Sequence, residues 1–191
     1  IIKRFMDICF AVPMLIISSP LWLIIMASIK FDSKGPVFYK QERVGKNHGH
    51  FFIYKFRTMV ANAEELTGPV WAKESDPRIT RMGRILRRFR LDELPQLLMV
   101  INGGMSLIGP RPERPYFVEK LVKEFPFYYR RHKIRPGITG WAQIKHPYDQ
   151  DIKDVRQKLK YDFYYIENLS FSLDFKILLS TVWVMLSGKG R

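Results

Sequence analysis

The sequence has little cysteine and comparatively few acidic residues. Its one cysteine, Cys9, lies within an apolar run, which excludes a disulfide framework and a cysteine-ligated metal site and predicts a buried, inert thiol. The 32 lysines and arginines outnumber the 18 aspartates and glutamates, so the formal net charge is +14. This charge indicates a polyanionic partner, whether nucleic acid, an anionic membrane surface or a phosphorylated substrate.

The sequence also lacks the signatures of several common enzyme sites. It has no P-loop, no dinucleotide-binding glycine fingerprint and no serine-centred nucleophile elbow. Internal repeats and low-complexity tracts are absent as well. The 191 residues suffice for one domain with a substantial core. Because the first residue is Ile1 rather than methionine, we expect the sequence to be part of a longer protein.

Charge is missing from one long stretch, residues 8–29. About 20 apolar residues can cross a bilayer, but Ser18-Ser19-Pro20 predicts a helix break because proline removes a backbone donor. A spanning helix would place one of the two flanking basic pairs outside the cell, against the positive-inside tendency; these pairs are Lys3 with Arg4, and Lys30 with Lys34. We therefore favour a re-entrant helix–break–helix anchor over residues 1–34, with Ser19 and Pro20 at the break, over a span or a core helix.

The part of the chain after the anchor alternates between a hairpin pattern and short helical patterns. Segments 37–44 and 51–59 are rich in β-forming residues and predict a β-hairpin. Asp76-Pro77 is typical of a helix start. The helix that follows would carry two stripes, one apolar (Ile79, Met82, Ile85, Leu86 and Phe89) and one basic (Arg78, Arg81, Arg84 and Arg87). The basic stripe fits either a solvated face or contact with phosphate or lipid headgroups.

Two adjacent carboxylates, Asp92 and Glu93, follow the basic stripe and are expected to begin another helix. Its predicted buried face consists of Leu94, Leu97, Leu98 and Ile101. The positive end of the helix dipole favours negative charge, including that of a bound diphosphate. The residues alone leave two interpretations of Asp92 open, a plain N-cap and part of a phosphate site.

Two stiff loops, residues 109–115 and 135–141, each carry arginine beside proline and glycine. A rigid loop that fixes a guanidinium suits phosphate recognition, although a simple surface turn is the alternative. The aromatic and basic run 125–131 fits a membrane-interface belt, a base-stacking platform or core packing. A helix over residues 170–187 fits core packing or an in-plane interfacial position. Together these elements predict a mostly helical α+β fold, with amphipathic interfacial helices around a compact core.

A series of motifs along nearly the whole chain closely resembles the bacterial sugar transferase family, the monotopic polyprenyl-phosphate phosphoglycosyl transferases. The motifs are, in order, Lys3-Arg4-x-x-Asp7, Ser19-Pro20, Gly35-Pro36-Val37-Phe38, Tyr54-Lys55-Phe56-Arg57-Thr58-Met59, Asp76-Pro77-Arg78, Leu91-Asp92-Glu93-Leu94-Pro95-Gln96, Met105-Ser106-Leu107-Ile108-Gly109-Pro110-Arg111-Pro112 and Arg135-Pro136-Gly137-Ile138-Thr139-Gly140-Trp141-Ala142-Gln143. Residues 158–166 resemble the larger exopolysaccharide-initiating members, which carry extra N-terminal transmembrane helices and a regulatory-type domain.

The resemblance implies a catalytic domain over residues 35–191 that faces the cytoplasm at the bacterial inner membrane. The implied reaction moves a sugar-1-phosphate from a UDP-sugar, UDP-glucose or UDP-galactose, to undecaprenyl phosphate. Its products are undecaprenyl-diphosphate-sugar and UMP, and it is the first membrane step of exopolysaccharide, capsule or O-antigen assembly. Further partners implied are anionic lipids of the cytoplasmic leaflet, and a missing N-terminal part could drive homodimer formation.

The resemblance also implies roles for individual residues. Asp92 would be the nucleophile, and Glu93, together with Asp92, would hold Mg2+. A carboxylate nucleophile divides one difficult displacement into two easier ones, and cations must neutralise the three negative reactants. The candidates for phosphate binding are Lys55, Arg57, Arg78, Arg111 and Arg135, and Gln143 is a candidate for the uridine or sugar end.

Two alternatives to this mechanism stay open from the sequence. In the first, the protein is a one-step transferase in which Asp92 only binds metal. In the second, it is a basic, membrane-tethered module that binds nucleic acid or anionic lipid without catalysis. The sequence has no helix-turn-helix, zinc-finger or RNA-binding signature, so we expect no nucleic-acid partner.

Overall fold

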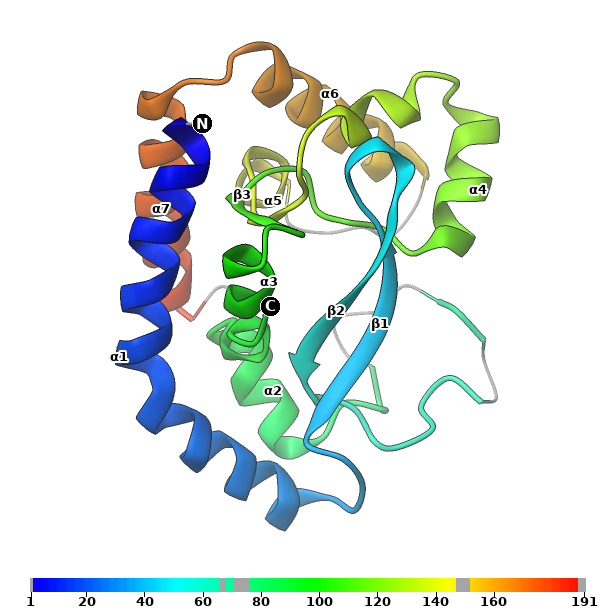
Figure 1. The fold of residues 1–191 in the computed structure, drawn as a ribbon. Helices are drawn as coiled ribbons and strands as arrows, with labels where there is room; N and C mark the ends of the chain where they lie inside the picture. The colour runs from blue at the N-terminus through cyan, green and yellow to red at the C-terminus, as the bar shows by residue number, and fades with distance from the viewer. Residues whose placement is uncertain (1, 66–67, 71–75, 147–151, 189–191) are drawn as a thin grey trace.

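The structure, a computed structural model, describes residues 2–65, 68–70, 76–146 and 152–188. These residues form a mostly helical fold with two small two-stranded sheets, consistent with the predicted α+β class (Figure 1). The elements are α1 (Ile2–Asp32), β1 (Phe38–Val44), η1 (Lys46–His48), β2 (His50–Phe56), α2 (Arg81–Arg88), η2 (Leu91–Glu93), α3 (Gln96–Ile101), β3 (Ser106–Ile108), α4 (Pro115–Glu124), η3 (Tyr128–Lys133), β4 (Gly137–Thr139), α5 (Trp141–Lys145), α6 (Ile152–Glu167) and α7 (Phe171–Leu186).

Helix α1 is continuous over 31 residues and curves along its length (Figure 1). Its backbone stays helical through Ser19 and Pro20, so the predicted break is a bend within one helix. The Ser19 hydroxyl donates to the carbonyl of Ile16 at 2.8 Å, and serine and proline are common causes of helix bending. α1 is long and apolar enough to cross a membrane, and most of its surface is uncovered. Cys9 is therefore exposed, and the prediction of a buried thiol was wrong.

Polar contacts near the N-terminus of α1 fasten this helix to the rest of the protein. The buried Asp7 carboxylate accepts hydrogen bonds from Ser106 Oγ at 2.9 Å and from the Leu107 amide at 3.0 Å. Lys3 Nζ lies 2.7 Å from the buried Asp174 carboxylate of α7. A buried carboxylate without partners would be costly, so Asp7 and Asp174 keep these contacts in the folded protein. The contacts thereby fix α1 against β3 and α7.

The predicted hairpin is confirmed, with β1 and β2 antiparallel and Val44 opposite His50. The second sheet was not predicted. In it, β3 and β4 pair in parallel, which brings the two stiff loops side by side. A Cβ atom added at Gly137 would lie 2.1 Å from the Gly109 nitrogen, so the close approach of the two loops requires glycine there.

Helix α2 begins later than the sequence pattern predicted. Thr80 is its N-cap and accepts a hydrogen bond from the Gly83 amide at 3.0 Å. The helix cannot start at Asp76 because Ile79 pairs with Met59 in an isolated antiparallel bridge, which requires extended backbone. The predicted apolar stripe is also only partly right, since Ile85, assigned to it, is exposed.

The segment from residue 91 to residue 101 is helical in two parts, η2 and α3. The carboxylates thus lie in a helical turn, as predicted, but the first turn is a 3₁₀ turn. Leu97 belongs to the buried face, whereas Leu98, also predicted there, is exposed and Val100 is buried instead. Leu97 and Val100 pack in the main core with residues of α1, β2, β3 and α7.

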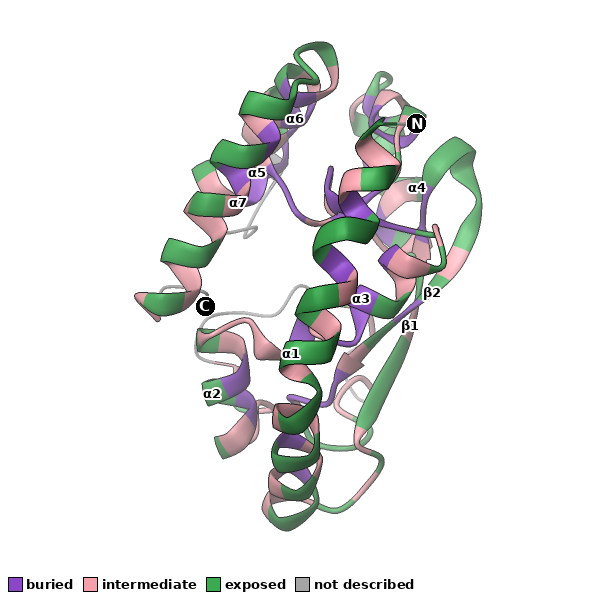
Figure 2. Ribbon diagram, turned by 60° about the vertical axis from the view of Figure 1, so that its left-hand side comes forward, coloured by how far each residue is buried: buried purple, intermediate pink, exposed green. Residues whose placement is uncertain are grey.

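Helix α7 begins at the N-cap Ser170 and buries only Asp174 and Ile177. The ribbon of α7 is coloured mostly as exposed or intermediate in Figure 2. Most of its apolar residues are exposed, namely Phe171, Phe175, Leu179, Val182, Trp183 and Leu186. Of the two predictions for this helix, core packing is therefore wrong for most of the apolar face. The aromatic run 125–131 is part core and part surface, because Tyr128 is fully buried and Phe127 is exposed.

Candidate active site

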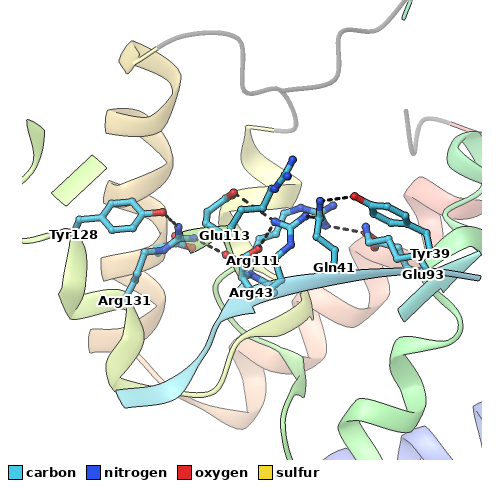
Figure 3. Close-up of polar contacts among 12 residues, drawn as sticks. Tyr39, Gln41, Arg43, Glu93, Arg111, Glu113, Tyr128 and Arg131 are labelled. Carbon is cyan, nitrogen blue, oxygen red and sulfur yellow. Dashed lines mark hydrogen bonds and ion pairs between the residues drawn. The ribbon is translucent and has the colours of Figure 1, made fainter. Parts of the chain in front are cut away.

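The two carboxylates of Asp92 and Glu93 are both buried in η2. Glu93 Oε1 accepts hydrogen bonds from two cations that come from separate elements. Lys55 Nζ of β2 donates at 2.8 Å, and Arg111 Nη1 of the loop after β3 donates at 2.9 Å. Figure 3 shows the Arg111 side chain directed toward Glu93. The fold thereby gathers charges that are 38 and 18 positions apart in the sequence.

These cations decide the ionisation of Glu93. Burial by itself would raise the pKa of this carboxyl, but the charges of Lys55, Arg111 and Arg90 and the hydrogen bond from Lys55 outweigh it and hold the pKa well below its usual range. Glu93 is therefore a carboxylate at neutral pH, and one of its oxygens is fully used by the cations.

Asp92 has different surroundings although it is the adjacent residue. Within the described residues its carboxylate accepts no hydrogen bond, and it caps no helix, because the N-cap of η2 is Arg90 and that of α3 is Pro95. Burial raises the pKa of Asp92, the nearby Lys55 charge opposes this shift, and the Glu93 charge adds to it. The N-cap interpretation is thus wrong. Asp92 is a buried carboxylate near cations, with lone pairs that no described residue uses.

Arg87 is a further cation near Asp92 that was predicted only as part of the basic stripe. It lies in the last turn of α2, half-buried, and its Nε donates to Thr58 Oγ1 at 3.0 Å. Burial lowers the pKa of Arg87, and the charge of Asp92 opposes this shift. Arg81 and Arg84 of the same stripe are exposed. Within this stripe Arg81 and Arg84 face solvent, whereas Arg87 lies near the site, and the spacing in the sequence could not reveal this difference.

Three of the five predicted phosphate-binding residues do not contact Asp92 or Glu93 in the described structure. Arg57 donates to the Ser33 carbonyl at 2.7 Å and so holds the C-terminal end of α1. Arg78 binds both carboxylate oxygens of Asp76, at 2.8 and 2.6 Å. The Arg135 side chain is exposed on its loop. Lys55 and Arg111 are the two predicted residues that the fold brings to the carboxylate pair.

Gln143 lies behind Arg111, buried in α5. Its amide nitrogen donates to the Ile138 carbonyl at 3.1 Å, and its Oε1 has no partner among the described residues. Arg111, Glu113 and Gln143 line a small cavity of about 30 Å³. A cavity of this size holds about one or two water molecules, which would supply the missing donor.

The family resemblance implies a magnesium ion at this carboxylate pair. In the described parts of the chain, no group of three or more histidine, cysteine or acidic side chains is placed to hold a metal. The oxygens that remain as possible metal ligands are those of Asp92 and the second oxygen of Glu93. Mg2+ commonly takes one or two carboxylates and completes its shell with water and substrate phosphate oxygens. The pair therefore fits an Mg2+ ion that binds together with a diphosphate.

Comparison with known proteins gives the family. The family model described as bacterial sugar transferase matches residues 1–188. An Aeromonas hydrophila UDP-N-acetylgalactosamine-undecaprenyl-phosphate N-acetylgalactosaminephosphotransferase is 49% identical over 99% of this chain and 44% of its own length. The exopolysaccharide production protein PSS of Rhizobium leguminosarum bv. phaseoli is 41% identical over all of this chain and 98% of its own.

A third relative is the UDP-glucose:undecaprenyl-phosphate glucose-1-phosphate transferase of Escherichia coli, which is 37% identical over 96% of this chain and 40% of its own length. This chain thus spans less than half of the Aeromonas and E. coli relatives and nearly all of the Rhizobium protein. Because the family model covers almost the full sequence, the chain belongs to the bacterial sugar transferase family.

Proposed function

We propose that the protein transfers a sugar-1-phosphate from a UDP-sugar to undecaprenyl phosphate, through a covalent phosphosugar intermediate on Asp92. The observation that carries this proposal is the unequal use of the two buried carboxylates. Glu93 is held by Lys55 and Arg111, whereas Asp92 lies near the same cations and accepts no hydrogen bond from any described residue. The names of the relatives, which act on UDP-sugars and undecaprenyl phosphate, support the choice of substrates.

The reaction divides into two displacements at one phosphorus atom. An Asp92 oxygen attacks the sugar-proximal phosphorus, a new Asp92–phosphorus bond forms, and the phosphoanhydride bond breaks to release UMP. A phosphate oxygen of undecaprenyl phosphate then attacks the same phosphorus, which forms the diphosphate product and restores the carboxylate. Each half-reaction brings two anions together, so neutralising cations are needed.

Lys55, Arg111 and Arg87 are proposed to supply this neutralising charge. Lys55 and Arg111 are already fixed by Glu93 before substrate binds, so little reorganisation is needed. Mg2+ held by Glu93 and Asp92 would contribute further charge neutralisation at the diphosphate. Arg57, Arg78 and Arg135, which lie elsewhere, are not assigned to the reacting phosphate, and Gln143 stays a candidate for the sugar or uridine end.

The membrane arrangement proposed is a re-entrant anchor, residues 1–34, in the cytoplasmic leaflet of the bacterial inner membrane. Both ends of α1 are bonded to the same folded body, which supports this proposal. Lys3 contacts Asp174 at one end, and the Asp32 carboxylate accepts from the Met82 amide at the other. We propose that the folded body, residues 35–191, lies on one side of the bilayer, and in this arrangement both helix ends belong to that side.

The sugar is proposed from the resemblance as glucose or galactose, and relatives named for N-acetylgalactosamine add a third candidate. The test is UMP release from a panel of UDP-sugars with undecaprenyl phosphate in nanodiscs. One of the three is expected to release UMP, with the parallel initial-rate lines of a ping-pong mechanism. Intersecting lines would favour a one-step transferase. No release with any UDP-sugar, together with steeply salt-dependent nucleic-acid binding, would favour the binding module.

A further inference from the structure

Four consecutive carbonyl groups of the Arg111 loop, residues 109–113, each accept a hydrogen bond from a different residue, two of which are in β1. The Pro110 carbonyl accepts from the Gly137 amide at 3.0 Å, and the Glu113 carbonyl accepts from the Val44 amide at 2.9 Å. Between them, the Arg111 and Pro112 carbonyls accept from two side chains, Arg131 Nη2 at 3.0 Å and Arg43 Nη1 at 2.8 Å. The backbone that carries the Arg111 side chain is therefore fixed on both sides of that residue.

The group that holds the Arg111 carbonyl is itself a buried charge. The Arg131 guanidinium also donates to the Tyr128 hydroxyl, and its Nη2 lies 2.8 Å from Asp162 Oδ2 of α6. The side chains of Arg131 and Asp162 are only 8% and 3% exposed. Figure 3 shows Arg111 between Glu93 on one side and Arg131 with Tyr128 on the other. A continuous polar path thus joins α6 to the candidate active site.

A buried ion pair of this kind is not explained by stability alone. The cost of removing two charges from water offsets much of their attraction, and an apolar pair of similar size is often as stable or more so. Asp162 forms an ion pair with Arg131, and Arg131 in turn donates to the backbone carbonyl of Arg111, whose side chain binds Glu93. An arginine that must meet a phosphate with correct geometry needs such support, because small misplacements cost large factors in rate.

We propose that Asp162 and Arg131 are positioning residues that act on the reaction through Arg111. This inference rests on the proposed function, since it concerns the rate of the same phosphoryl transfer. Neither residue touches the reacting groups. Their effect passes through the Arg111 carbonyl, so it should disappear when the Arg111 guanidinium is absent.

The test is a double-mutant cycle on single-turnover adduct formation and on kcat/KM for UMP release, with the full chain in nanodiscs. Asp162→Asn keeps the shape of the side chain and is expected to lower the rate roughly 10- to 100-fold in the wild-type background. In the Arg111→Ala background the same change is expected to alter the rate less than about twofold, because non-additivity reports a shared effect. Asp162→Glu, which keeps the charge, should restore much of the rate.

Tyr128→Phe provides a second route if Asp162→Asn does not fold, because it removes only the hydroxyl that contacts Arg131. Its smaller rate loss should likewise vanish in the Arg111→Ala background. The matched control is Asp174→Asn, which breaks a part-buried ion pair with Lys3 and has no hydrogen bond to residues 109–113 among the described residues. Any rate loss that Asp174→Asn causes should be the same factor in the wild-type and Arg111→Ala backgrounds.

The outcomes separate this inference from the proposed function. Suppose that the wild type is active and that Asp162→Asn or Tyr128→Phe lowers the rate by the same factor in the wild-type and Arg111→Ala backgrounds. That result would overturn the positioning role and leave the transferase proposal intact. A wild type that releases no UMP and forms no adduct would overturn the transferase proposal itself. Thermal unfolding of each variant confirms that folded protein is compared.

Discussion

Asp92 and Glu93 are neighbours in the sequence, yet the fold gives their carboxyl groups opposite pKa shifts. Lys55 and Arg111 hold the pKa of Glu93 low, whereas burial raises that of Asp92. The sequence motif pointed to the pair but could not show this difference, because the cations come from a strand and a loop far away in the chain. Arg57 illustrates the limit: it follows Lys55 by two positions, but it lies beyond the end of β2 and bonds to Ser33 instead.

Replacing Glu93 with glutamine should destabilise the protein at neutral pH. The change leaves Lys55 and Arg111 without their carboxylate, and removing one partner of a buried pair costs roughly 3 kcal/mol. Because the pKa of Glu93 is lowered by folding, its stabilising contribution is present above its ordinary pKa and is lost as pH falls through the lowered value. The difference between wild type and Glu93→Gln in denaturant unfolding should therefore shrink in acid. Equal stability at neutral pH would contradict this account.

The raised pKa of Asp92 predicts a pH dependence for formation of the covalent intermediate. Only the carboxylate form attacks phosphorus, and burial favours the protonated form. The single-turnover rate should thus fall as the pH is lowered, with a midpoint above the ordinary aspartate pKa. A rate that stays constant down to that ordinary value would show that Asp92 titrates normally or does not attack.

The hairpin and the helices α1, α2, α3 and α7 were predictable from β-forming segments, apolar patterns and helix-start residues, whereas α4, α5 and α6 were not predicted. The start of α2 was not, because pairing between Ile79 and Met59 is a tertiary contact that overrides the Asp76-Pro77 signal. The parallel pairing of β3 with β4 also escaped prediction, since each strand is only three residues long.

Helix α2 depends on a glycine that lets it approach the backbone after β2. A Cβ atom at Gly83 would lie 2.0 Å from the Thr58 carbonyl oxygen, so Gly83→Ala should destabilise the protein by about 1–3 kcal/mol or more despite the better helix propensity of alanine. Gly104→Ala is the matched control, because the nearest contact of its added Cβ would be an ordinary 3.8 Å, to the Met99 carbonyl oxygen. Thermal unfolding measures both. A stabilising effect of Gly83→Ala would mean that α2 is not packed this closely.

At the scale of the whole molecule, α1 leaves and rejoins the same folded body, and α7 presents an apolar face to the outside. The flanking charges of α1 predicted that both of its ends lie on the cytoplasmic side of the membrane, and this stays a prediction. They could not show that the bend at Ser19 and Pro20 lies within an unbroken helix. They also could not show the contacts of Asp7 with β3, which depend on residues about a hundred positions away.

The re-entrant arrangement predicts that both ends of α1 face the cytoplasm. Cysteines introduced as Ile2→Cys and Phe31→Cys, in a Cys9→Ser background, should both resist a membrane-impermeant thiol reagent applied to the outside of intact spheroplasts. Both should react after permeabilisation, because these two side chains are exposed on the folded protein. Labelling of one end from outside would show that α1 spans the membrane.

The central claim, a phosphosugar carried on Asp92, is tested most directly by mass spectrometry. The full chain is mixed with its UDP-sugar and no lipid acceptor, quenched in acid and digested. We expect the peptide that contains Asp92 to gain the mass of one sugar phosphate in the wild type and none in Asp92→Asn, and we expect added undecaprenyl phosphate to remove the adduct. Turnover by wild-type protein without any adduct, or an equal adduct on Asp92→Asn, would contradict the claim.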